Sequence, residues 1–251
     1  MGRHVRKFII LAVFCVFVVG GVMGCFSYTH KMKSMDLAQR LQYTLDRVTD
    51  GKNVHGTAFY VYRGSDGFEW NGSSGNMNSG SRYSIASVTK MYTAAVILRL
   101  IEERSLGWDD PIANFLPPDT MKNLHVYEGT DYSAKITIRD LLSHTSGLPD
   151  YFSESTDKKI SIEEMRKTNG DVSYTIDDVL DKTKTLAPHF APGSKGKAYY
   201  SDGNYQLLGI IIERVTGRPL NEIYQDFIFT PLKLENTYLQ VDKTQWGIAP
   251  I

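Results

Sequence analysis

Residues 83–90 read Tyr83-Ser-Ile-Ala-Ser-Val-Thr-Lys90 and run directly into the apolar stretch 91–104. The spacing of the apolar residues in this stretch predicts a helix with one buried side, formed by Ala94, Ala95, Ile97, Leu98 and Ile101. Ser87 and Lys90 stand three residues apart, so on a helix the Lys90 amine can reach the Ser87 hydroxyl. Serine acyl-transferases use this Ser-x-x-Lys spacing when a lysine handles the proton. Alternatively, Ser87 caps the helix and Lys90 is a solvated surface residue.

Ser-x-x-Lys occurs twice more, at 155–158 and 194–197, in polar stretches with turn signals. Only Ser87 opens a long apolar helix. The free N–H groups of a helix's first turn also favour a developing oxyanion there. Context therefore favours Ser87 as the nucleophile.

The composition indicates a globular chain that acts on a small molecule or a short peptide. Its 251 residues are 42% hydrophobic, enough for one large domain or two small ones. Equal numbers of acidic and basic residues give no reason to expect a nucleic-acid partner. Cys15 and Cys25 both lie in the N-terminal apolar run, and the six histidines are scattered. We therefore expect no disulfide, metal or cofactor beyond residue 26, and no oligomeric state is implied.

The N-terminal segment 1–30 is predicted to be a signal peptide or membrane anchor. Arg3, Arg6 and Lys7 precede an uncharged run over 8–26, which places the rest of the chain outside the cytoplasm. Val22-Met-Gly-Cys25 resembles a bacterial lipobox, so lipidation at Cys25 and an uncleaved anchor are both open. The expected location is the outer face of a bacterial cell membrane, or secretion.

Several further elements follow from local patterns. We expect an amphipathic helix over 31–50, a hairpin with strands at 55–63 and 68–70, and a loop over 71–80. A helix starts near 136 with Thr137 and Asp140 as a capping box. Residues 150–185 are interpreted as a polar surface insertion, and an apolar helix over 207–215 ends at Gly217.

A second cluster of polar residues precedes the helix predicted over 207–215. It reads Tyr199-Tyr-Ser-Asp-Gly-Asn204. A tyrosine near a lysine could relay a proton. Alternatively, the tyrosine packs its ring and Asp202 caps the next helix.

Five blocks together resemble the serine beta-lactamase and D-Ala-D-Ala peptidase superfamily, in its class C branch with the low-molecular-weight DD-carboxypeptidases and related esterases. They are YSIASVTK at 83–90, LLSHTSGLPDY at 141–151, PG at 192–193, YSDGNYQLLG at 200–209 and PLKLENTYL at 231–239. The resemblance implies an α+β, beta-lactamase/transpeptidase-like fold over 31–251, with a helical domain packed beside an antiparallel sheet and the site between them.

The resemblance also implies residue roles: Ser87 is the acylated nucleophile, Lys90 its proton partner and Tyr200 the general acid/base. Position 202 is usually Asn, which hydrogen-bonds the substrate amide and the lysine. Asp202 is thus the substrate-binding residue, but a carboxylate accepts without donating, and it would pair with Lys90 and favour its charged form. Ser201 would be the proton shuttle if the block followed the class A pattern instead. His144 is expected to be structural, as a cap at a helix end.

The family's third motif, Lys or His followed by Ser or Thr and then Gly, is missing from this sequence. The nearest match, at 167–170, comes too early in the chain. By the resemblance, the C-terminal sheet strands and half of the oxyanion hole are then missing too, which would leave the Ser87 helix without its packing surface. The expected activity is acyl transfer from D-Ala-D-Ala peptides, beta-lactams or esters. The alternative is a catalytically silent, truncated relative that only binds cell-wall peptide or a partner.

Overall fold

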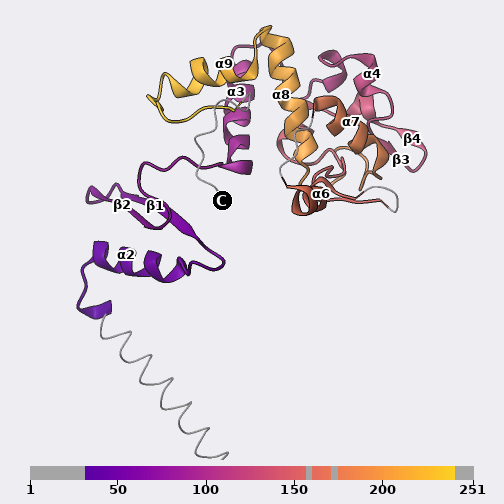
Figure 1. The fold of residues 1–251 in the computed structure, drawn as a ribbon. Helices are drawn as coiled ribbons and strands as arrows, with labels where there is room; N and C mark the ends of the chain where they lie inside the picture. Colours follow the sequence, from indigo (N-terminus) through magenta and orange to yellow (C-terminus); the bar gives the residue numbers. More distant parts are fainter. Residues whose placement is uncertain (1–31, 157–159, 171–174, 241–251) are drawn as a thin grey trace, which may run out of the picture. The chain divides into compact units, whose positions relative to one another are not determined.

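The computed structural model describes residues 32–156, 160–170 and 175–240 (Figure 1). The chain divides into two compact units, with the boundary between Ser84 and Ile85. The predicted signal peptide or anchor at 1–30 lies outside the described residues. Within the described ranges, no helix has both the length and the apolar character needed to cross a membrane.

The first unit consists of one helix and one hairpin: α2 (Leu37–Val48), β1 (Gly56–Arg63) and β2 (Phe68–Gly75). The predicted helix and hairpin are confirmed. Asp36 caps α2, because its Oδ1 accepts from the Gln39 N–H at 2.8 Å and Gln39 Oε1 accepts from the Asp36 N–H at 3.1 Å. Leu45 is the buried residue of this helix.

The loop predicted for 71–80 is wrong at its start, because β2 continues to Gly75. Residues 71–75 pair in antiparallel register with 56–60 of β1. Their Gly and Ser content suggested a loop, but the ladder and a bond from α2 stabilise them as a strand. Gln42 Nε2 donates to the Ser73 carbonyl at 2.9 Å, so the hairpin is tied to the helix beside it.

The second unit begins with a 3₁₀ turn (Ala86–Thr89) that leads into α3 (Lys90–Glu102). It is mostly helical, and its only described sheet is a two-stranded pair, β3 (Val126–Tyr127) and β4 (Thr130–Asp131). The remaining α-helices are α4 (Pro118–Met121), α5 (Ile138–Leu142), α6 (Ile162–Asn169), α7 (Ile176–Thr185), α8 (Asp202–Thr216) and α9 (Leu220–Tyr224). A π-helical turn (Gln225–Phe229) follows α9.

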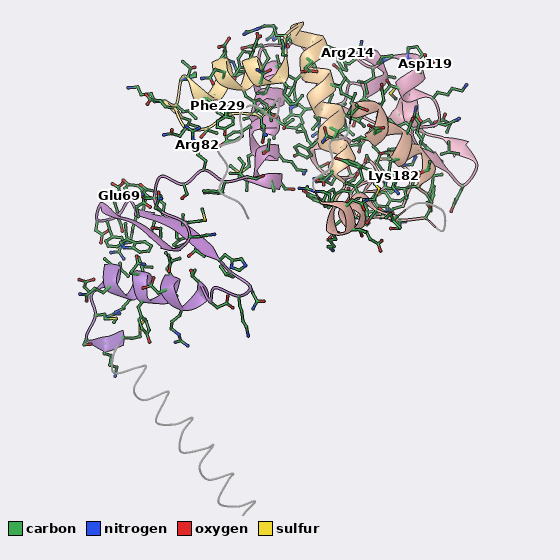
Figure 2. The ribbon with its side chains drawn as sticks, viewed as in Figure 1. Glu69, Arg82, Asp119, Lys182, Arg214 and Phe229 are labelled. Carbon is green, nitrogen blue, oxygen red and sulfur yellow. The ribbon has the colours of Figure 1, made fainter. Side chains whose placement is uncertain are left out.

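The core of this unit forms where α3, α8 and α9 pack together (Figure 1). From α8, the buried residues recur at helical spacing; they are Leu207, Leu208, Ile211 and Ile212. Phe229 of the π-helical turn, labelled in Figure 2, packs edge-on against Tyr92 of α3, and the ring centroids lie 5.2 Å apart. The expectation that α3 would lack a packing surface is therefore wrong for this side of the helix.

The predicted inner side of α3 is confirmed at Ile97 but wrong at Ala95 and Leu98, which are exposed. Its buried residues are Thr93, Val96, Ile97 and Leu100, whereas Leu98 is 44% exposed. The Thr93 hydroxyl lies 2.6 Å from the Tyr224 hydroxyl in α9, and this buried polar contact helps to set the rotation of the helix. Because α3 is apolar on most of its circumference, its sequence does not mark one side uniquely.

Local signals for helix ends are confirmed in α5 and α8. The Thr137 Oγ1 accepts from the Asp140 N–H at 3.2 Å, and Asp140 Oδ2 accepts from the Thr137 N–H at 3.1 Å. Gly217 ends α8 with φ +67, a left-handed conformation that glycine adopts without a steric penalty. The segment predicted as a polar surface insertion has a buried side: Ile162 of α6 and Val179 of α7 pack with Tyr151.

His125 is fully buried between β3 and the loop that carries Phe190. Its Nε2 donates to the Phe190 carbonyl at 3.0 Å, while Nδ1 has no hydrogen-bond partner. Burial lowers the pKa of His125, so the folded protein holds this ring neutral.

The free energy of unfolding is expected to fall as the pH drops below about 6.5, the ordinary histidine pKa, because the unfolded chain then binds a proton that the folded chain rejects. Above that pH this contribution to stability is complete. The expected loss by pH 5 is on the order of 1 kcal/mol, measured by urea unfolding across this range. His125→Gln keeps the donor to Phe190 but cannot titrate, so its stability should depend less steeply on pH. An unchanged slope would rule His125 out as the source.

Candidate active site

Ser87 lies in the 3₁₀ turn immediately before α3, and Lys90 is the first residue of that helix. Ser87 therefore opens the helix, as predicted, but from a 3₁₀ turn and not from the α-helix itself. The Ser87–Lys90 contact still forms, because a 3₁₀ helix has three residues per turn and so brings positions i and i+3 to the same side. Lys90 Nζ donates to Ser87 Oγ at 3.1 Å.

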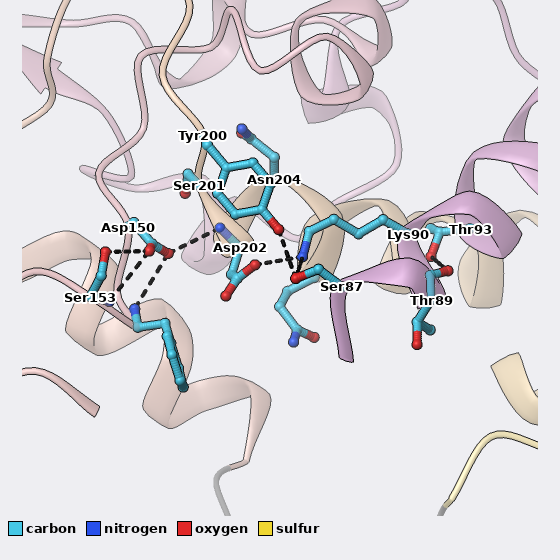
Figure 3. Close-up of polar contacts among 12 residues, drawn as sticks. Ser87, Thr89, Lys90, Thr93, Asp150, Ser153, Tyr200, Ser201, Asp202 and Asn204 are labelled. Atoms are coloured by element: carbon cyan, nitrogen blue, oxygen red, sulfur yellow. Dashed lines mark hydrogen bonds and ion pairs between the residues drawn. The ribbon is translucent and has the colours of Figure 1, made fainter. Parts of the chain in front are cut away.

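Tyr200 approaches the same oxygen from the segment that precedes α8. Its hydroxyl donates to Ser87 Oγ at 2.8 Å (Figure 3). The ring is stacked on His144, with centroids 4.6 Å apart, and the Lys90 ammonium lies 5.0 Å from its centroid. Tyr200 is 49% exposed, so a substrate can reach its hydroxyl.

Asp202, the first residue of α8, pairs with Lys90, the first residue of α3. Its Oδ1 lies 2.5 Å from Lys90 Nζ, and both side chains are mostly buried (Figure 3). The alternative in which Asp202 caps the helix is wrong, because α8 has no side-chain cap and this carboxylate faces Lys90. Burial works against the charge on Lys90, but the hydrogen bonds and charges of Asp202 and Tyr200 outweigh it and raise the pKa of Lys90.

Replacing Asp202 by asparagine is expected to lower the pKa of Lys90, because burial then becomes the dominant influence on the ammonium. In the wild type, the raised pKa keeps Lys90 protonated through neutral pH. In Asp202→Asn, neutral amine forms at lower pH and can then accept the Ser87 proton, a route that the charged lysine of the wild type does not offer, so the rate of reaction at Ser87 should begin to rise at lower pH. The measurement is the rate at which a neutral fluorophosphonate phosphonylates Ser87, with release of fluoride, across neutral and basic pH.

Asp109→Asn is the matched control for that experiment. It also removes one carboxylate from this unit, but Asp109 is exposed and pairs with Arg139. Its pH profile should match the wild type. A profile of Asp202→Asn that also matches the wild type would contradict the assignment of Lys90 protonation to Asp202.

Ser201 is turned away from the nucleophile. Its side chain is fully buried, and Oγ donates to the Pro149 carbonyl at 2.8 Å. The structure thus brings Tyr200, and not the Ser201 hydroxyl, to Ser87.

His144 holds the segment that carries Tyr200. Its Nδ1 accepts from the Ser201 N–H at 3.2 Å and lies 2.9 Å from Asn204 Nδ2. Burial, together with the nearby Lys90 charge, lowers the pKa of His144. A neutral ring with Nδ1 as acceptor suits both contacts, so the arrangement is the structural one expected for this histidine.

Asp150 is a site-supporting residue that sequence reasoning did not identify. It is 5% exposed, and its Oδ1 accepts from the Asp202 N–H at 3.0 Å, while Oδ2 accepts from the Ser153 hydroxyl at 2.5 Å (Figure 3). Asp150 therefore fixes the start of α8 and with it Asp202. The only sequence signal was its place at the end of the 141–151 block.

The Ser-x-x-Lys string at 194–197 does not form such a site, and the string at 155–158 ends at Lys158, which lies outside the described residues. Ser194 donates to the Ala191 carbonyl at 2.6 Å, and Lys197 Nζ lies 5.8 Å from the centroid of the Phe190 ring. Across the described part of the chain, no three His, Cys, Asp or Glu side chains gather as a group that could hold a metal ion.

Comparison with known proteins gives a family match and two kinds of relative. The Beta-lactamase family model matches residues 41–247. N-acetylmuramyl-L-alanine amidase of Bacillus subtilis (strain 168) is 29% identical over 191 residues, which cover 76% of this chain and 40% of that protein. A candidate D-alanyl-D-alanine carboxypeptidase of Escherichia coli (strain K12) is 33% identical over 168 residues, covering 63% of this chain and 34% of that protein.

Among solved structures, a D-stereospecific amidohydrolase from Streptomyces sp. is similar to this chain. It is 30% identical with a TM-score of 0.64, over 80% of this chain and 56% of that one. The chain therefore spans 34–40% of the length of the two curated relatives. Its mixture of helices and small antiparallel sheets is the fold of these serine hydrolases, as predicted.

Proposed function

The chain belongs to the Beta-lactamase family, and from that premise we propose that it is a serine hydrolase that works through an acyl-enzyme on Ser87. One observation carries the proposal: Ser87 Oγ receives hydrogen bonds from both Lys90 Nζ, at 3.1 Å, and the Tyr200 hydroxyl, at 2.8 Å. An ordinary surface serine does not have a cation and a phenol converging on one oxygen.

In the proposed reaction, Ser87 Oγ attacks the substrate carbonyl carbon and an ester bond forms. Lys90 is held as an ammonium by Asp202, so it does not accept the Ser87 proton. Tyr200 relays that proton: its oxygen takes the Ser87 proton while its own proton moves towards the leaving group. The bond from the carbonyl carbon to the leaving nitrogen or oxygen then breaks, and Tyr200 protonates the leaving group. Water releases the acyl group and restores Ser87.

We propose D-Ala-D-Ala peptides, beta-lactams and esters as the substrate range. The motif blocks around Ser87 and Tyr200 support this range, as do a relative named for D-alanyl-D-alanine carboxypeptidase activity and a structural neighbour named as D-stereospecific. Membrane attachment through 1–30 on the outer face of a bacterial cell is also a proposal, supported by the basic residues before the apolar run.

Covalent labelling of the wild-type chain tests the function. After incubation with a fluorophosphonate or a fluorescent penicillin, intact mass should rise by one adduct, and peptide mapping should locate it on the peptide that contains Ser87. A chain that takes no adduct, although folded by circular dichroism, would favour the silent alternative, which binds cell-wall peptide without turnover. An adduct on another residue would refute Ser87 as nucleophile.

A further inference from the structure

Asp202 presents a carboxylate oxygen that the protein leaves available. Oδ1 is bonded to Lys90 at 2.5 Å, and within the described chain Oδ2 has no hydrogen-bond partner. The side chain is 21% exposed, and Oδ2 is not among the buried polar atoms without a partner. An incoming molecule can therefore reach it.

The position of this oxygen ties it to the reaction. The Lys90 ammonium contacts both Ser87 Oγ and Asp202 Oδ1 (Figure 3), so a substrate whose carbonyl carbon meets Ser87 has its neighbouring groups beside Asp202. An asparagine at 202 could donate to a substrate carbonyl. An aspartate can only accept, so a carbonyl there would face a carboxylate, whereas an N–H or ammonium would gain a hydrogen bond.

The surrounding charges favour a cation at this place. Among the described residues, Lys90 is the one cation bonded to Asp202, and Asp150 adds a second carboxylate, which is buried and bonded through Oδ1 to the Asp202 N–H. Within the described chain, the Asp150 carboxylate accepts from neutral N–H and O–H donors. The His144 Nδ1 accepts from the N–H of Ser201, the residue before Asp202, so this ring adds no positive charge there. Two carboxylates against one ammonium leave the site with an excess of negative charge.

We propose that Asp202 makes this site select substrates that carry a free α-ammonium group next to the scissile carbonyl, in preference to the same substrates with an acylated nitrogen. This rests on the proposed function, since it names the substrate class of the Ser87 site. The ammonium would donate to Asp202 Oδ2, opposite the Lys90 bond to Oδ1.

The test compares D-alanine p-nitroanilide with N-acetyl-D-alanine p-nitroanilide. The ratio of their kcat/KM values should favour the free amine by about ten- to a hundredfold in the wild type, as expected for a charge-assisted hydrogen bond. In Asp202→Asn the ratio should fall to about one or reverse. Asp202→Asn also changes the pKa of Lys90, but that change affects the hydrolysis of both substrates alike and cancels in the ratio. Asp109→Asn should keep the wild-type ratio.

The pH dependence adds a second signature. The preference should fade above about pH 8, where an α-amino group loses its proton. A wild-type ratio of one or below, or a ratio that Asp202→Asn leaves unchanged, overturns the inference while fluorophosphonate labelling of Ser87 still supports the hydrolase function.

A binding measurement tests the inference even if the protein does not hydrolyse these substrates. Calorimetric titration of Ser87→Ala with D-alaninamide and with N-acetyl-D-alaninamide should show tighter binding of the free amine. The double variant Ser87→Ala, Asp202→Asn should lose that difference. Equal binding of both amides by Ser87→Ala overturns the proposed selectivity, whatever the outcome of the labelling experiment.

Discussion

Ser87→Ala is expected to remove covalent labelling by fluorophosphonates entirely and to lower hydrolysis by about a thousandfold or more. The methyl group leaves no oxygen for Lys90 Nζ and the Tyr200 hydroxyl to contact, and no atom on which an acyl group can be carried. Ser87 lies in a turn outside the apolar core, so the variant should fold. Labelling is followed by intact mass and hydrolysis by a chromogenic ester.

Ser194→Ala is the matched control, because Ser194 also opens a Ser-x-x-Lys string. Its hydroxyl donates to the carbonyl of Ala191, three residues earlier, and bonds to no lysine within the described chain. Labelling and hydrolysis should remain at wild-type levels. If Ser194→Ala lost labelling and Ser87→Ala kept it, the site assignment would fail.

Tyr200→Phe is expected to lower the rate of acylation by about a hundred- to ten-thousandfold, the range typical of a general acid/base. The variant retains the ring that stacks on His144 and removes only the hydroxyl 2.8 Å from Ser87 Oγ. Binding of a noncovalent substrate analogue should change little. Stopped-flow acylation with a chromogenic beta-lactam or ester measures the effect.

Tyr205→Phe supplies the comparison. Tyr205 is also close to Lys90, whose ammonium lies 5.7 Å from its ring centroid, but its hydroxyl donates to the Leu142 carbonyl. We expect acylation within a fewfold of the wild type. Equal losses in the two variants would indicate a general effect on packing around Lys90 and would remove Tyr200 from the reaction.

The parts of this protein that local sequence could predict are those held by short-range contacts. The Thr137 and Asp140 capping box and the glycine at the end of α8 involve residues a few positions apart. The Ser87–Lys90 contact is of the same kind. The opposite charges of Lys90 and Asp202 predicted their pairing once the motif blocks had suggested that the two segments meet.

Tertiary contacts explain what the sequence did not reveal. The buried side of α3 depends on where α8 and α9 lie, and an almost wholly apolar helix leaves that choice open. Residues 71–75 become a strand because β1 offers a partner. Asp150 supports Asp202 through a backbone N–H 52 residues away, a contact that no spacing rule anticipates.

The Lys90–Asp202 ion pair joins positions 112 residues apart. Contacts across so long a loop carry a large entropic cost of closure and form after the local helices. An incompletely folded chain thus contains an unactivated serine, and reactivity appears only when α8 has docked on α3. The rate at which labelling develops during refolding would therefore report directly on the last stages of folding.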